Sequence, residues 1–92
     1  MEDEAGAVKS VFPGQAGKID RLVSRDEVFA ALCRDFDLAV SEHRNWTASN
    51  APEREERLAE YAMLINELRG EIQRALESAD VVRLRADNLG RP

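Results

Sequence analysis

Apolar residues recur at alternating steps of three and four along two stretches of the chain, with charged residues between them. Over residues 25–46 the repeating positions are Phe29, Leu32, Phe36, Ala39, His43 and Trp46. Over residues 51–79 they are Leu58, Tyr61, Ile65, Leu68, Ile72, Ala75 and Ala79. Residues three and four apart share one face of an α-helix, so each stretch is predicted to be an amphipathic helix with a heptad stripe.

Capping signals predict where these helices begin. Ser24 and Glu27 form an S-x-x-E capping box, and Asn50 with Glu53 forms a second one, with Pro52 in the first turn. The helices are therefore expected at about 25–46 and 51–79. The short connection between them predicts an antiparallel, coiled-coil-like hairpin in an all-α protein.

The two ends of the chain lack such a pattern. Residues 1–18 hold three of the five glycines and a proline, which predicts a flexible arm. Residues 19–23 are either a short turn or a preceding helical stretch. The hairpin is expected over residues 19–79, and residues 80–92 are interpreted as a frayed tail.

The chain is too small for a lone two-helix hairpin to bury a large core. The chain has 92 residues and few aromatics, so it buries a small core. A two-helix unit cannot cover both flanks of its stripes, and four residues are expected to stay exposed in a monomer: Val28, Val40, Leu64 and Leu76. Pairing with a second copy, in a dimeric four-helix bundle, would supply the missing burial.

Charge and composition exclude several partners. The formal net charge is −5, which argues against sequence-independent binding to nucleic acid. No apolar run approaches the length that spans a bilayer, and no signal-peptide pattern is visible in residues 1–18. A single cysteine fits a reducing, cytoplasmic setting.

No enzyme motif is present, which leaves single residues as candidates for chemistry. His43, in the first stripe, is interpreted as a polar residue near the hairpin tip, the alternative being a metal ligand or pH sensor. Cys33 is interpreted as a small core residue, the alternative being a reactive thiol. No catalytic residue, cofactor, metal site or small-molecule substrate is predicted.

The leader and first helix resemble a known family. Ile19-Asp20-Arg21-Leu22, Ser24-Arg25-Asp26 and Phe29-x-x-Leu32-x-x-x-Phe36-Asp37 are similar to the opening of the small YdcH-like bacterial proteins. Residues 58–76 are similar to that family's second helix, including Leu68-Arg69-x-Glu71-Ile72. The resemblance covers about residues 19–77 and implies a helical hairpin, without implying an activity.

These observations predict a non-catalytic protein that acts through self-association or through contact with another protein. The alternative is a small accessory or regulatory subunit that docks on a larger complex. A third hypothesis is a metal-binding or redox protein that uses His43 or Cys33. The expected core and interface residues are Phe29, Leu32, Phe36, Val40, His43, Trp46, Leu58, Tyr61, Ile65, Leu68, Ile72 and Leu76.

Overall fold

The computed structural model describes the backbone of residues 5–89 and the side chains of residues 5–79. Within those residues the chain forms helices and no strand, which confirms the all-α prediction. The helices are α1 (Gly6–Val11), α2 (Ala16–Arg25), α3 (Glu27–Thr47) and α4 (Arg54–Leu89).

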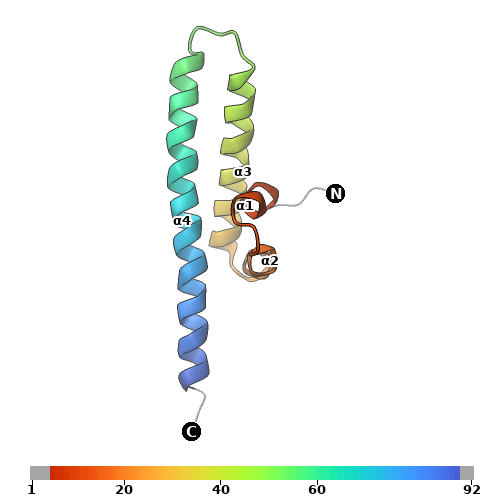
Figure 1. Ribbon diagram of the computed structural model, residues 1–92, viewed down its shortest axis with the longest axis vertical. Coiled ribbons are helices and arrows are strands. Elements are labelled where there is room, and N and C mark those ends of the chain that lie inside the picture. Colours follow the sequence, from red (N-terminus) through yellow and green to blue (C-terminus); the bar gives the residue numbers. More distant parts are fainter. Residues whose placement is uncertain (1–4, 90–92) are drawn as a thin grey trace.

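The long helices α3 and α4 lie side by side and run in opposite directions, joined by residues 48–53 (Figure 1). Phe29, Phe36 and Ala39 of α3 are buried with Leu68, Ile72 and Leu76 of α4. At about 1.5 Å per residue, the 36 residues of α4 span roughly 54 Å and the 21 of α3 roughly 31 Å. The C-terminal part of α4 therefore extends beyond the start of α3 (Figure 1).

The N-terminal segment differs from the flexible arm expected for residues 1–18. Residues 6–11 form α1, and α2 begins at Ala16, with a turn between them in which Gly14 has φ +89°. Both helices pack against α3, and Val8 and Ile19 are fully buried in the same core as Phe29. Residues 19–23, for which two readings were open, lie inside α2.

The start of α3 also differs from the prediction. Helix α2 continues through Arg25, so Ser24 lies in its last turn, where the hydroxyl donates to the Arg21 carbonyl at 2.9 Å. Asp26 is the N-cap of α3 instead: its Oδ1 accepts from the amides of Val28 and Phe29 at 3.0 and 3.2 Å. The predicted Ser24–Glu27 capping box is therefore wrong.

Helix α4 begins later and ends later than predicted. It starts at Arg54, four residues beyond Asn50, so the Asn50–Glu53 capping box does not form and Pro52 lies in the turn. Its backbone stays helical to Leu89, through most of the segment expected to be frayed. Residues 1–4 and 90–92 of the predicted arm and tail lie outside the described residues.

Candidate functional site

The twelve expected core and interface residues fall into two groups. Five are buried: Phe29, Phe36, Leu68, Ile72 and Leu76. The others are half-buried, and four of them pack against the core: Leu32, Val40, Tyr61 and Ile65. The remaining three lie toward the turn between α3 and α4: His43, Trp46 and Leu58. The heptad positions thus form the seam between the two long helices, with its best-buried part away from the turn.

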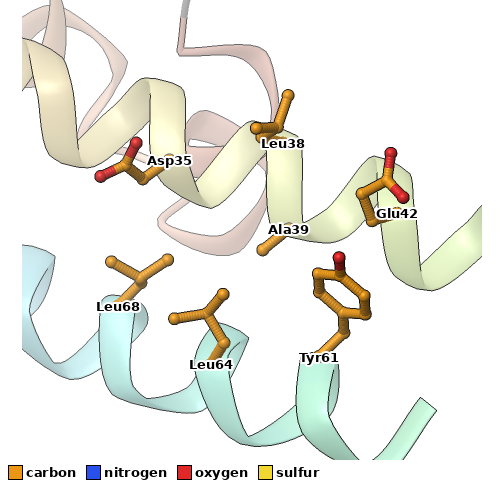
Figure 2. Close-up of a pocket in the computed structure, with 7 residues that line it drawn as sticks. All are labelled: Asp35, Leu38, Ala39, Glu42, Tyr61, Leu64 and Leu68. Atoms are coloured by element: carbon orange, nitrogen blue, oxygen red, sulfur yellow. The ribbon is translucent and has the colours of Figure 1, made fainter. Parts of the chain in front are cut away.

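One side of this seam is open. A shallow groove of about 210 Å³ runs between α3 and α4, and we name its lining the open face: Asp35, Leu38, Ala39, Glu42, Tyr61, Leu64 and Leu68. Figure 2 shows Tyr61, Leu64 and Leu68 pointing from α4 toward α3, with Ala39 opposite them. Leu38 is 67% exposed and Leu64 is 40% exposed. Large apolar side chains therefore remain in contact with water along this groove.

The opposite flank of the seam is covered by α1 and α2. Both pack on α3, and their buried residues join Cys33 in the core. On a helix, Cys33 and Leu38 lie about 140° apart, because successive residues turn by about 100°. The N-terminal helices therefore cover one flank of α3 and leave Leu38 uncovered on another.

This cover changes which residues stay exposed. Of the four expected to be uncovered, Leu76 is buried and Val40 is half-buried, whereas Val28 is 73% exposed and Leu64 stays exposed. Sequence reasoning missed Leu38, which belongs to neither heptad stripe. The available signal was its helical spacing, three residues after Asp35 and four before Glu42, which places it on the same side of the helix as those two carboxylates.

The open face is edged by carboxylates, which we name the acidic rim: Asp35, Glu42, Glu60, Glu67 and Glu71. The first two line the groove, and the other three lie at helical spacings of four, three and seven residues from Leu64. Four of them are in no ion pair within the described part of the chain: Asp35, Glu42, Glu67 and Glu71.

Arg57, one of the cations on this side of α4, is already engaged. Arg57 donates to Glu60 at 2.6 Å, and this hydrogen bond raises the pKa of Arg57 above its ordinary value. A cation whose pKa is raised on folding stabilises the folded chain at every pH below its ordinary pKa. It loses this contribution only as the pH rises through the raised pKa. For Arg57 this loss would occur only at strongly alkaline pH, so the Arg57–Glu60 ion pair is unchanged near neutral pH. The acidic rim therefore keeps its excess of negative charge.

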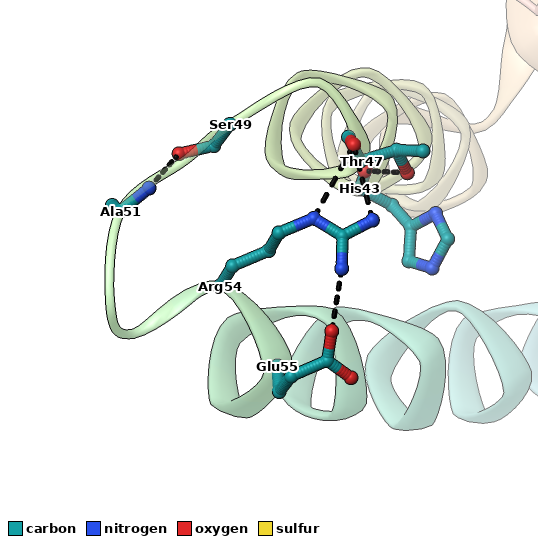
Figure 3. A network of polar contacts seen from close by, with 6 residues as sticks. All are labelled: His43, Thr47, Ser49, Ala51, Arg54 and Glu55. Atoms are coloured by element: carbon teal, nitrogen blue, oxygen red, sulfur yellow. Dashed lines mark hydrogen bonds and ion pairs between the residues drawn. The ribbon is translucent and has the colours of Figure 1, made fainter.

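A polar network holds the connection between α3 and α4 (Figure 3). The Arg54 guanidinium donates from Nε and Nη2 to the Thr47 carbonyl, at 3.3 and 3.1 Å, and also pairs with Glu55. The Ser49 hydroxyl accepts from the Ala51 amide at 3.0 Å, and Thr47 Oγ1 donates to the His43 carbonyl at 2.9 Å. His43 takes part through its backbone, so the network fixes the turn and assigns no chemistry to the ring.

The structure assembles no metal cluster from its described side chains. Among the described residues, no group of three or more His, Cys, Asp or Glu residues is placed to hold a metal ion. Cys33 is fully buried. No helix in the described residues has the length and apolar character needed to cross a membrane.

Comparisons with protein-family models, curated proteins and solved structures find no match to this chain. The fold is that of a small helical protein, and the most distinctive feature of its surface is the open face.

Proposed function

We propose that this chain is a non-catalytic helical interaction protein and that the open face is its contact surface. The observation that carries the proposal is the pair Leu38 and Leu64, exposed along one groove while α1 and α2 cover the opposite flank. A single exposed leucine is ordinary on a protein surface. Leucines on both sides of one groove can be removed from water together by one partner helix.

One candidate partner is a second copy of the chain. Two α3–α4 hairpins packed through their open faces would form a four-helix bundle with C2 symmetry. The heptad spacing of both helices supports this arrangement, because such stripes pack well against other helices. A reducing, cytoplasmic setting fits a chain with one buried cysteine.

The other candidate is a different protein, with this chain as a small accessory subunit. The acidic rim favours this candidate, because a contact between two identical acidic surfaces sets like charges against each other. A relationship to the YdcH-like proteins remains a proposal that rests on the sequence of residues 19–77.

The contact surface is tested by site-specific photo-crosslinking in the native host. A photoreactive amino acid replaces Leu38 in one variant and Val11 in the control, since Val11 is also exposed, at 39%, but lies on α1, which packs on the covered flank of α3. We expect a defined covalent adduct from position 38 and none of the same size from position 11. Equal labelling from both positions, or none from position 38, would contradict the proposal.

The mass of the adduct separates the two candidates. A product of twice the chain's mass that yields only this chain's peptides identifies a second copy. A product that contains peptides of another protein identifies the accessory-subunit role.

A further inference from the structure

We infer that the open face binds a basic amphipathic helix of another protein. The inference rests on the proposed function, in which this face is a contact surface, and it names the chemistry of the partner.

The shape of the groove fits a helix. Its floor is apolar, formed by Ala39, Tyr61 and Leu68. Leu64 lies beside this floor on α4, and Leu38 lies at the outer edge of the groove on α3, where it projects away from α4 (Figure 2). The groove runs between two antiparallel helices, so an added helix would pack against both of them. Such a partner needs a row of apolar side chains spaced three and four residues apart.

The charges of the groove set the character of the partner's flanks. Asp35 and Glu42 edge the α3 side and are seven residues apart, which is two helical turns or about 10 Å. Glu60 and Glu67 edge the α4 side at the same spacing, one on each side of Leu64 along the helix. A partner helix with lysine or arginine on both flanks of its apolar row would place cations along both edges.

The same charges disfavour a second copy as the occupant. A C2 contact places the same patch of each copy against the other, so the acidic rims would meet. Like charges set against each other across an interface weaken it. Arg57 does not offset them, because Glu60 already engages its guanidinium within each copy, and Arg74, three residues after Glu71, is one cation beside five carboxylates.

The test uses the full chain and three synthetic peptides that carry a fluorescent label. The basic peptide has leucines at helical spacing with lysines on both flanks, the acidic peptide replaces the lysines with glutamates, and the scrambled peptide keeps the basic composition without a common leucine face. Fluorescence anisotropy should show binding of the basic peptide at least about tenfold tighter than that of the other two.

Variants of the chain locate the site. The double variant Glu42→Gln, Glu67→Gln removes two rim charges and should weaken the basic peptide about tenfold, while Glu53→Gln, Glu77→Gln removes the same charge away from the groove and should change its affinity less than twofold. Leu38→Ser should weaken binding by a similar factor without altering the far-UV circular dichroism spectrum.

Three results would overturn the inference: equal binding of the basic and scrambled peptides, equal loss in the rim and control variants, or a tight homodimer that Leu38→Ser disrupts. The last result would leave the proposed function intact, because the open face would still be a contact surface. Failure of the proposed function is seen separately, as the absence of any adduct from position 38 in the native host.

Discussion

Asp26 is the residue at which α2 gives way to α3, and it serves both helices. Its backbone amide donates to the Leu22 carbonyl at the end of α2, and its carboxylate accepts the two amides at the start of α3. The extended backbone of Asp26, φ −128° and ψ 105°, turns the chain between them. One short acidic side chain thus allows two helices to follow each other without a loop, which places Ile19 and Phe29 in the same core.

We expect Asp26→Ala to lower the free energy of unfolding by about 1 kcal/mol, because the first amides of α3 lose their acceptor. In a domain of this size the melting temperature should fall by roughly 4–8 °C. Ser24→Ala is the control and should cost less than about 0.5 kcal/mol, since Ser24 is exposed within α2. Denaturation followed by circular dichroism measures both, and the reverse ranking would restore Ser24 as the cap.

The short helices α1 and α2 cover core residues of α3 that the pairing of α3 with α4 would leave exposed. Two helices alone cannot cover Cys33, which lies beside the seam on α3, and a small chain has little burial to spare. Val8 and Ile19 supply that cover and are themselves fully buried. The folding unit is therefore four helices, with α3 in contact with all the others.

Ile19→Ala should lower the free energy of unfolding by about 2–4 kcal/mol, the usual range for a buried isoleucine cut to alanine. Val11→Ala, at an exposed apolar position of α1, is the control and should cost less than about 0.5 kcal/mol. Urea titration of both variants provides the comparison. Near-equal stability of the two would mean that the N-terminal helices do not pack on α3.

Arg54→Ala should lower the free energy of unfolding by about 1 kcal/mol, because the last turn of α3 loses two charge-assisted hydrogen bonds to the Thr47 carbonyl. The matched control is Arg44→Ala, which also removes one guanidinium, at an exposed position of the same region. Thermal melts of the two variants separate the turn contact from a general charge effect, and a larger loss in Arg44→Ala would refute the role given to Arg54.

At the scale of the whole molecule, shape and charge act together on the open face. The molecule is elongated, with extents of 65 × 28 × 22 Å, and it has one flank covered by short helices and another edged by carboxylates. On the proposed contact surface, the uncovered leucines would favour association, whereas the acidic rim would disfavour contact between two identical copies. These two effects respond differently to salt.

Binding of the basic peptide should weaken as salt is raised from tens of millimolar to about 0.5 M, because ions screen attraction between exposed charges. Self-association of the chain through the open face should strengthen over the same range, because the repulsion between acidic rims is screened. Anisotropy and sedimentation velocity measure the two equilibria. A salt dependence of the same sign in both would show that the acidic rim does not control the choice of partner.

The spacing of apolar residues along the chain is enough to predict the two long helices and the centre of their seam. The three- and four-residue spacing of Phe29, Leu32 and Phe36, and of Leu68, Ile72 and Ala75, is a local property, and any helix with that spacing has one apolar face. It also singled out Leu64 as uncovered. The capping boxes were misplaced because Ser24 and Asp26 both suit a cap, and the choice between them depends on where α2 ends.

Which flank of the seam is covered depends on how α1 and α2 pack on α3. The burial of Val8 and Ile19 depends on contacts with residues distant in the sequence, and a run of one or two helical turns does not predict against which helix it packs. Once α1 and α2 occupy one flank of α3, Leu38 and Leu64 are left on the other, beside carboxylates brought together from two helices. The open face is therefore a product of packing, because its two edges come from chain segments that only the fold places side by side.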